Sequence, residues 1–417
     1  GTVMKRIFIS LFFFAFMWTA AGADASPELL FVRWPANPDA VWYSFRIVPV
    51  TQHFGRKEMR PPIYEDGHVF RDSVMIEKEI TDSYDGPGIL CCQVKAIGLD
   101  GQSISAYSAP VPMEKAAQEM ERYAPKIRVK YHEQNGTVLL YPAYSFVKIP
   151  HAVSYEVEIT DEEPENPDGC EPSVHRISQG IVTIPELFDE LPRQGTVWWR
   201  VRGLDEDGGP VGVWSEAEKI VNDPAENWET GILGDSISHG GGRMSYSPAD
   251  WPYNYAYYLD FPTINMSRSG DKTEDLLRRF DADVLPFHVQ YLLIMGGTNN
   301  LRSGETAEEV IADLEALQEK CRSGGIEPVL LTIPPIAPER ILKYYHQPTA
   351  ENWKAEFDKV NGWIRTQTHI DTAAPFAMYE DMPENLAADG LHPDKEAKEK
   401  MGKIINEKFS EGGLRLR

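Results

Sequence analysis

Two stretches of this chain match each other 107 residues apart, and this internal repeat limits the fold more than any other feature of the sequence. The segment CQVKAIGLDGQSISAYSAP, which starts at Cys92, aligns without a gap with WRVRGLDEDGGPVGVWSEA, which starts at Trp199. In each copy, apolar residues alternate with other residues, an Asp-Gly pair follows, and a short second run comes after it. Alternation interrupted by a tight turn is typical of a β-hairpin. The first half of the chain is therefore predicted to contain two copies of one β-rich module.

The two copies are predicted to be all-β sandwiches that occupy residues 27–117 and 124–223. Each copy contains further alternating runs, and each has about the length of a seven-stranded sandwich. The Asp-Gly stretch is followed by Tyr-Ser (107–108) in the first copy and by Trp-Ser (214–215) in the second. On this pattern the modules resemble fibronectin type III domains.

The sequence changes character after residue 223, where apolar runs of strand length begin to alternate with amphipathic helices. Residues 291–295 form one such buried run, and residues 306–321 follow it with apolar side chains on one helical face. Strands that alternate with helices favour a parallel sheet covered by helices on both faces. We therefore predict a three-layer α/β (αβα) domain over residues 228–412, closed by a last helix at 393–409.

The charge of the chain argues against nucleic acid as a partner. There are 64 acidic and 41 basic side chains, and the formal net charge at pH 7 is −23. This excess of negative charge repels phosphate backbones and anionic membrane surfaces at long range.

Residues 1–23 have the pattern of a cleavable signal peptide. Basic residues 5–6 precede an apolar run at 7–18, and the small residues 21–23 fit a signal peptidase site. The apolar run is short for a bilayer span, which favours an exported protein without a stable membrane span. The predicted location is therefore secreted or periplasmic.

Four short polar segments lie where strands of the α/β domain are expected to end or where its last helix is expected to begin. They are Gly-Asp-Ser at 234–236, Ser-Arg-Ser-Gly at 267–270, Gly-Gly-Thr-Asn at 296–299 and Asp-Gly-Leu-His at 389–392. Loops at the carboxyl ends of parallel strands form the ligand sites of open α/β sheets. The segments and their order resemble the four sequence blocks of the SGNH hydrolases, also called the GDSL esterases, and the resemblance covers residues 228–412.

This resemblance implies a role for five residues. Ser236 would be the nucleophile, His392 the general base, and Asp389 the residue that orients the histidine. A serine hydroxyl needs an adjacent base to take its proton, and imidazole titrates near neutrality. The backbone N–H of Ser236, the backbone N–H of Gly270 and the side-chain amide of Asn299 would form the oxyanion hole.

Three residues near the nucleophile are candidate substrate contacts, namely His239, Tyr246 and Trp251. The aromatic rings suit stacking on sugars, although core packing explains them equally well. The sequence has no metal-binding motif and no phosphate-binding loop, so neither a metal nor a cofactor is expected.

These observations predict a secreted serine ester hydrolase that forms an acyl-serine intermediate. Within this class we expect a carbohydrate O-acetylesterase, whose substrate is an acetylated polysaccharide or oligosaccharide. A lysophospholipase or thioesterase of the same family is the first alternative. The second alternative is a non-catalytic protein that binds glycans or acts as a scaffold through its sandwich modules.

Overall fold

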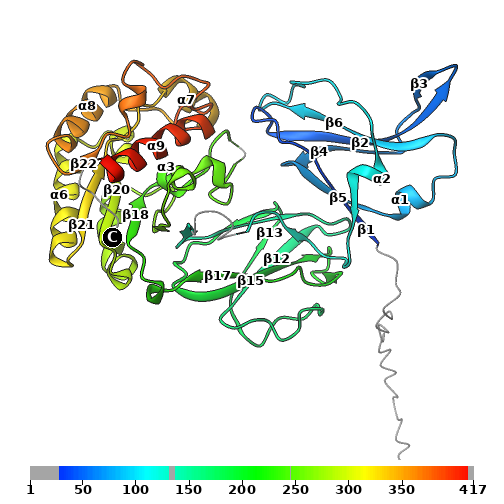
Figure 1. The fold of residues 1–417 in the computed structure, drawn as a ribbon, viewed down its shortest axis with the longest axis horizontal. Coiled ribbons are helices and arrows are strands. Elements are labelled where there is room, and N and C mark those ends of the chain that lie inside the picture. Colours follow the sequence, from blue (N-terminus) through cyan, green and yellow to red (C-terminus); the bar gives the residue numbers. More distant parts are fainter. Residues whose placement is uncertain (1–27, 131–136, 245, 412–417) are drawn as a thin grey trace, which may run out of the picture.

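The computed structural model describes residues 28–130, 137–244 and 246–411 and arranges them in three parts (Figure 1). Two β-rich modules come first, and an α/β domain forms the C-terminal part. The predicted signal peptide, residues 1–23, lies outside the described residues. Among the described helices, none has the length and apolar character that a membrane crossing requires.

The first module consists of two antiparallel sheets that pack face to face. Its elements are β1 (Leu29–Arg33), β2 (Trp42–His53), β3 (Arg56–Met59), β4 (Tyr64–Phe70), β5 (Ser73–Glu77), α1 (Glu79–Asp82), β6 (Ile89–Ile97), β7 (Val111–Pro112), α2 (Met113–Ala116) and β8 (Ala117–Glu119). One sheet has the order β5-β1-β8, and the other has the order β3-β2-β6-β7 with β4 also paired to β2. Phe45 and Ile47 of β2 share a buried cluster with Val32 of β1. The two sheets therefore enclose one core, as in a β-sandwich.

The second module repeats this plan. Its elements are β9 (Lys126–Ile127), β11 (Ala143–Val147), β12 (Ser154–Thr160), β13 (Arg176–Val182), β14 (Glu186–Phe188), β15 (Gly195–Leu204), β16 (Pro210–Val211) and β17 (Glu218–Asn222). A sheet of order β14-β11-β9 faces a sheet of order β13-β12-β15-β16, in which β17 also pairs with β15. Phe146, Val157 and Trp199 meet in the buried cluster between the two sheets. The predicted two-module, sandwich-like organisation agrees with these antiparallel sheets, while the fibronectin type III assignment stays a prediction.

One hydrogen bond occurs at the same repeat position in both modules. The Ser108 hydroxyl oxygen accepts from the backbone N–H of Val94 at 3.0 Å, and the Ser215 hydroxyl oxygen accepts from that of Val201 at 3.0 Å. These pairs are separated by the same 107 residues as the matching sequences. In each module, the serine that follows the aromatic residue therefore hydrogen-bonds to the backbone of a strand in the same module.

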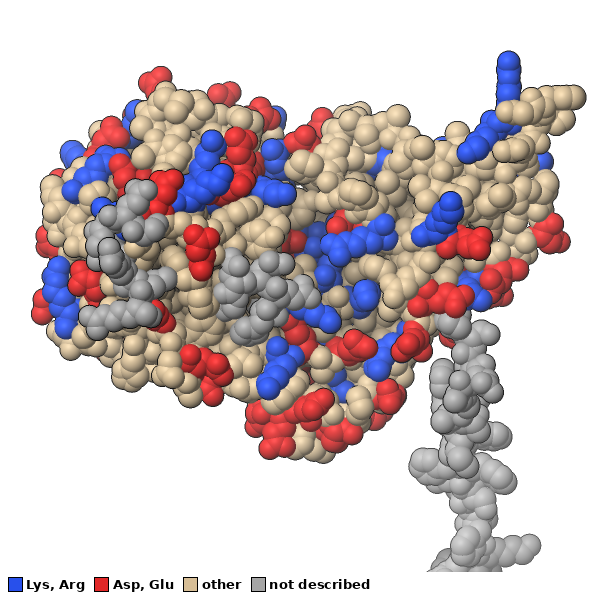
Figure 2. Space-filling view, viewed as in Figure 1, with Lys and Arg blue, Asp and Glu red and all other residues tan. Residues whose placement is uncertain are grey.

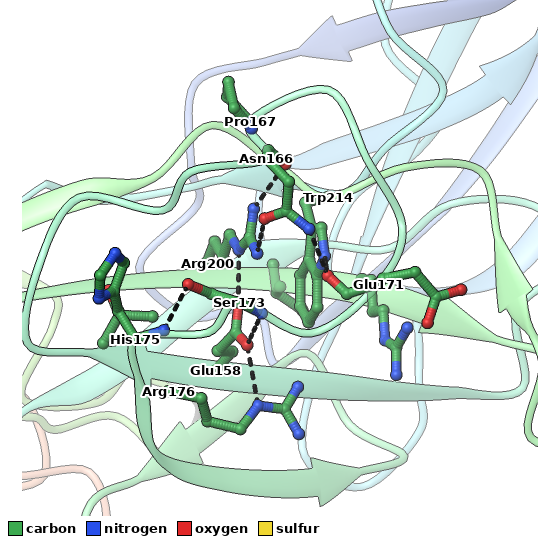
Figure 3. Close-up of polar contacts among 12 residues, drawn as sticks. Glu158, Asn166, Pro167, Glu171, Ser173, His175, Arg176, Arg200 and Trp214 are labelled. Carbon is green, nitrogen blue, oxygen red and sulfur yellow. Dashed lines mark hydrogen bonds and ion pairs between the residues drawn. The ribbon is translucent and has the colours of Figure 1, made fainter. Parts of the chain in front are cut away.

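The aromatic residue before each serine packs under a basic side chain. In the second module the Arg200 guanidinium lies 4.4 Å from the ring centroid of Trp214 and donates to Glu158 at 2.7 Å (Figure 3). In the first module the Arg46 guanidinium lies 3.7 Å from the ring centroid of Tyr107. These contacts give the repeated motif a structural role within the sandwiches.

The C-terminal domain contains a parallel sheet, as predicted. Its strands are β18 (Thr230–Gly234), β19 (Ile264–Asn265), β20 (Tyr291–Met295), β21 (Glu327–Leu331) and β22 (His369–Ile370), joined at one edge by β10 (Val138–Leu139). The strand order is β10-β19-β18-β20-β21-β22, and every pair is parallel. All residues of β18 and β20 are buried, because helices cover both faces of the sheet.

Helices pack on the sheet in two groups (Figure 1). The helical elements are η1 (Pro224–Glu226), α3 (Ser236–His239), η2 (Trp251–Tyr253), η3 (Tyr255–Tyr258), α4 (Thr273–Asp283), η4 (Leu285–Phe287), α5 (Thr298–Arg302), α6 (Ala307–Ser323), α7 (Pro338–Tyr345), α8 (Trp353–Ile364), η5 (Ala374–Phe376) and α9 (Lys395–Glu411). Helix α6 packs on α4 and α8, whereas α9 packs on η2 and η3. The predicted three-layer arrangement follows from these two groups.

The helix predicted over residues 306–321 is observed as α6, and its start has a clear local cause. The Thr306 hydroxyl oxygen accepts from the backbone N–H of Glu309, and the Glu309 carboxylate accepts from the backbone N–H of Thr306 at 2.9 Å. This reciprocal pair is a capping box. The predicted start of the last helix at Pro393 is wrong, because α9 begins at Lys395.

The second module and the C-terminal domain share a sheet edge, which the sequence did not predict. Strand β10 falls inside the range 124–223 that we assigned to the second sandwich, yet it pairs with β19 of the parallel sheet. The side chain of Asn222, at the end of β17, donates to the carbonyl oxygen of Leu139 at 2.9 Å. Strand β10, which lies between β9 and β11 in the chain, therefore connects the second sandwich to the C-terminal domain.

Charged side chains of both signs are spread over the face in Figure 2, with Lys and Arg side chains gathered near its middle. Acidic side chains are prominent along the lower rim of this face. The net negative charge of the chain is therefore not uniform over its surface.

Candidate active site

Ser236 lies where the central strand β18 ends and the short helix α3 begins. Asp235 caps this helix, because its Oδ1 accepts from the backbone N–H of Ile237 at 3.0 Å. Gly234 precedes the turn, and a Cβ at this position would lie 2.6 Å from the carbonyl oxygen of Met295. A side chain at Gly234 would thus collide with the neighbouring strand. The Gly-Asp-Ser sequence therefore allows the tight turn that places the serine at the carboxyl edge of the sheet.

Ser236, His392 and Asp389 form a continuous chain of hydrogen bonds. The Ser236 Oγ lies 3.0 Å from Nε2 of His392, and Nδ1 of His392 lies 2.5 Å from Oδ2 of Asp389. The other carboxylate oxygen of Asp389 accepts from the backbone N–H groups of Leu391 and His392, each at 2.8 Å. The structure thus brings together three side chains that the sequence separates by up to 156 positions.

The turn between Asp389 and His392 depends on Gly390. This glycine has a φ of +80°, and a Cβ there would lie 2.5 Å from the carbonyl oxygen of Ala337. Glycine adopts a positive φ without steric cost, so the chain can reverse and bring the carboxylate back to the imidazole.

Asp389 is fully buried and ionised. Burial alone would raise the pKa of this carboxyl, but the neighbouring His392 and the hydrogen bonds from His392 and Tyr345 hold its pKa well below the usual range. The phenolic hydroxyl of Tyr345 donates to Oδ2 of Asp389 at 2.7 Å. Tyr345 lies at the end of α7 and has no motif around it, so the sequence alone does not mark it.

Gly270 and Asn299 face the same cavity as Ser236. The Asn299 amide nitrogen donates one hydrogen to the carbonyl oxygen of Asp271 at 2.9 Å, which fixes its orientation and leaves its second hydrogen. Gly270 has a φ of +88°, and a Cβ there would meet no atom within 4 Å, so its backbone borders open space. Both groups therefore line the cavity that contains the serine hydroxyl, as donors of an oxyanion hole must.

A cavity of about 750 Å³ opens above Ser236 and His392. Most of its wall comes from loops at the carboxyl edge of the parallel sheet, but Phe188 comes from β14 of the second sandwich. Tyr246 also lines this cavity and stacks on Tyr253, with ring centroids 4.3 Å apart. Of the three candidate substrate contacts, Tyr246 is the one that the structure places in the cavity wall.

His239 does not face the cavity, which corrects the sequence-based suggestion that it contacts substrate. Its side chain is buried, with Nε2 2.8 Å from the carbonyl oxygen of Tyr141 and Nδ1 2.8 Å from the hydroxyl oxygen of Ser269. Burial lowers the pKa of His239 to about 4, so the imidazole is neutral near pH 7. This histidine connects the nucleophile helix to neighbouring segments.

Trp251 is also wrong as a substrate contact. Its side chain is buried in the core cluster of the second sandwich, and its indole N–H donates to the carbonyl oxygen of Lys130 at 3.0 Å. The tryptophan therefore anchors the loop after the nucleophile to the second module.

A buried ion-pair network joins all three parts of the chain beside the cavity. Asp250, at the end of the loop that carries Tyr246, pairs with Arg71 of the first module at 2.9 Å and with Arg128 of the second at 2.7 Å. Arg71 also pairs with Glu186 of the second module at 3.0 Å. All four side chains are at most 9% exposed. The first module is thus joined to the loop that carries Tyr246.

The described residues contain no group of three or more His, Cys, Asp or Glu side chains arranged to hold a metal ion.

Residues 232–400 match the model of the GDSL-like Lipase/Acylhydrolase family. A relative in Escherichia coli K12, named thioesterase 1/protease 1/lysophospholipase L1, is 29% identical over 171 residues, which cover 40% of this chain and 76% of the relative. The crystal structure of a lipase/acylhydrolase from Enterococcus faecalis is 25% identical, with a TM-score of 0.35, and covers 43% of this chain and 95% of that one. An acetyl-xylooligosaccharide esterase from Geobacillus is 18% identical, with a TM-score of 0.34, and covers 46% and 97% of the two chains.

Proposed function

We propose that this chain, whose residues 232–400 form a GDSL-like acylhydrolase domain, is a serine esterase that removes acetyl groups from carbohydrates. The acylhydrolase class rests on the family match. The catalytic roles, the acetylated substrate and export from the cell are our proposals.

The hydrogen-bonded chain from Ser236 through His392 to Asp389 is the observation that supports the catalytic roles best. Nε2 of His392 lies within hydrogen-bond distance of the serine hydroxyl, so it can take the proton while the oxygen attacks an acyl carbon. Asp389 accepts from Nδ1, which fixes the tautomer that leaves Nε2 free to accept. The ionised Asp389 then stabilises the imidazolium that forms.

The reaction proceeds in two halves, and in each half His392 first accepts a proton and then returns it. Attack by Oγ of Ser236 gives a tetrahedral intermediate, and the imidazolium returns the proton to the sugar oxygen as the ester bond breaks. Water then attacks the acetyl-serine while the same imidazole takes its proton, and the imidazolium returns this proton to Oγ of Ser236 as acetate leaves. Backbone N–H groups of Ser236 and Gly270, together with the Asn299 amide, stabilise the oxyanion in both halves.

The lining of the cavity supports a carbohydrate as the alcohol part of the ester, which leaves when the acetyl group is transferred to Ser236. Aromatic side chains of Tyr246 and Phe188 line it, and aromatic faces suit the apolar faces of sugar rings. Because Phe188 comes from the second sandwich, a long substrate would lie against both the hydrolase domain and that module. The signal-like pattern of residues 1–23 supports export, where polysaccharides are accessible.

A thioesterase or lysophospholipase is the second candidate function. The named activities of the Escherichia coli relative favour it, at 29% identity over the matched residues. A non-catalytic glycan-binding role is less well supported, since the serine, histidine and aspartate are all present and in contact.

Acetate release from a panel of acetylated glycans tests the proposal. The intact protein is expected to release acetate from at least one glycan, and Ser236→Ala is expected to release none while keeping its circular dichroism spectrum. A series of 4-nitrophenyl esters then separates the candidates: preference for acetate supports a deacetylase, and preference for octanoate or longer chains supports the lysophospholipase alternative. Equal acetate release by both proteins would refute the role of Ser236.

A further inference from the structure

Arg302 brings a positive charge into the wall of the candidate active site. It is the last residue of α5, three positions after Asn299, and its side chain lines the cavity together with Ser236 and His392. The guanidinium Nη1 lies 3.5 Å from Oδ1 of Asn299, the amide proposed as an oxyanion donor. A group bound to Arg302 would therefore lie next to the position of the reacting ester.

The polar contacts of Arg302 are to neutral oxygens. Nη1 faces the Asn299 amide oxygen, and Nη2 donates to the side-chain oxygen of Gln347 at 3.2 Å. Its Nε is buried and has no hydrogen-bond partner among the described residues. No carboxylate in the described part of the chain forms an ion pair with it. The guanidinium thus keeps unused capacity to donate hydrogen bonds.

Arg302 is half-buried, and arginines that are buried more deeply do have a carboxylate partner. The pairs, each with an arginine side chain at most 9% exposed, are Arg71 with Asp250, Arg128 with Asp250, Arg193 with Asp189, Arg200 with Glu158 and Arg279 with Asp271. Taking a charge out of water is costly unless an opposite charge compensates it. Burial accordingly lowers the pKa of Arg302, and the nearby acids Asp389 and Asp235 only partly offset this effect.

Neither of those two acids forms an ion pair with Arg302. Asp389 accepts from His392 and Tyr345, and Oδ1 of Asp235 accepts from the backbone N–H of Ile237 as the cap of α3. The other cation in the cavity wall, Lys272, pairs with Glu305 at 2.9 Å. Arg302 is therefore the cavity cation without an acidic partner among the described residues.

We propose that Arg302 binds a carboxylate of the substrate, and that the preferred substrate is an acetylated glycan whose sugars include a hexuronic acid. This inference rests on the proposed esterase function and narrows its substrate class. A guanidinium presents paired N–H donors that match the two oxygens of a carboxylate. A uronate carboxylate would complete the ion pair that the protein leaves open, and it would hold the sugar with its acetyl ester beside Ser236.

The test compares two substrates that differ only in this charge. Acetylated oligogalacturonides and their methyl-esterified forms share the ring and the acetyl group, but the methyl ester has no negative charge. Acetate release is measured specifically, so hydrolysis of the methyl ester does not interfere. For the intact protein, kcat/KM is expected to be about 10- to 100-fold higher on the free acid, as for a hydrogen bond to a charged group.

Variants of Arg302 identify the residue responsible. Arg302→Met is expected to bring the ratio of the two kcat/KM values to about 1, and Arg302→Lys is expected to give an intermediate ratio. Arg302→Gln provides a second neutral variant if the methionine variant does not fold. Arg278→Met is the matched control, because Arg278 is exposed and pairs with Asp275 on α4, and it is expected to keep the ratio of the intact protein.

The outcomes separate this inference from the esterase function. Equal kcat/KM of the intact protein on both substrates overturns the role of Arg302. Acetate release from both substrates would still support the esterase function. An unchanged ratio of the two kcat/KM values in Arg302→Met also overturns the role of Arg302. Faster cleavage of lysophosphatidylcholine than of either glycan would assign the guanidinium to a phosphate-bearing lipid instead. Failure to hydrolyse these substrates and 4-nitrophenyl acetate would refute the esterase function itself.

Discussion

The hydroxyl of Tyr345 donates a hydrogen bond to Oδ2 of Asp389 at 2.7 Å, the same oxygen that accepts from the catalytic histidine candidate. One carboxylate oxygen thus accepts two hydrogen bonds. We predict that Tyr345→Phe lowers kcat about 10-fold or more, because a hydrogen bond to a charged group is lost. The measurement is the pH profile of kcat, whose acidic limb should also move, since Asp389 then polarises the imidazole with a different strength.

Tyr344→Phe is the control for this variant. Tyr344 is the neighbouring residue on α7, and its ring lies near Lys343 rather than Asp389. Unchanged kcat in Tyr345→Phe, or an equal loss in Tyr344→Phe, would contradict a positioning role for Tyr345.

The amide of Asn299 is oriented toward the cavity by its bond to the Asp271 carbonyl oxygen. We predict that Asn299→Ala reduces kcat about 100- to 1,000-fold with a smaller change in KM, because an oxyanion donor acts mainly in the transition state. Steady-state kinetics on 4-nitrophenyl acetate measure this. A large rise in KM with kcat unchanged would instead assign Asn299 to substrate binding.

Arg71 joins the first sandwich module to Asp250, at the end of the loop that carries Tyr246. We predict that Arg71→Ala raises KM for a polymeric glycan and lowers the thermal midpoint, because Asp250 and Glu186 lose a buried positive partner. Arg71→Lys should recover part of both effects. Arg33→Ala is the control, since the Arg33 side chain is 58% exposed and pairs with Asp72 of its own module. Wild-type kinetics in Arg71→Ala would show that the first module does not influence the cavity loop.

The burial of His239 makes the free energy of unfolding of the domain depend on pH, and the sign of this dependence follows from the pKa shift. Burial lowers its pKa from 6.5 to about 4, so below pH 6.5 the unfolded chain binds a proton that the folded chain does not. The free energy of unfolding contributed by this group therefore falls as the pH drops from 6.5 toward 4, by about 2 kcal/mol between pH 7 and pH 5. Urea unfolding at both pH values should show a smaller drop for His239→Gln than for the wild type. An identical drop in the two proteins would contradict a buried neutral imidazole.

The sequence alone was sufficient to predict those parts of the fold and the site that local patterns determine. Ser236 and the pair of Asp389 and His392 each lie in a short segment whose glycines and polar residues dictate a turn after a strand or before a helix. The prediction that these segments come together in one site came from the family resemblance. The parallel sheet followed from alternating strand and helix patterns, since each element carries its own periodicity.

The residues that the sequence could not place depend on contacts between distant segments. Tyr345 reaches Asp389 from another helix, and Phe188 reaches the cavity from another module, so no local spacing marks either one. Strand β10 is only two residues long and gains its role from pairing with β19. His239 looked like a substrate contact because it follows the nucleophile, but a helix turn directs it into the core.

The central claim is that Ser236 is a nucleophile activated by His392, and covalent trapping tests it most directly. The intact protein is treated with a fluorophosphonate ester, digested and mapped by mass spectrometry. We predict one phosphonyl adduct on Ser236, loss of 4-nitrophenyl acetate hydrolysis in proportion to labelling, and no adduct in His392→Ala over the same time. Esterase activity that survives complete labelling, or an adduct on a different residue, would contradict the claim.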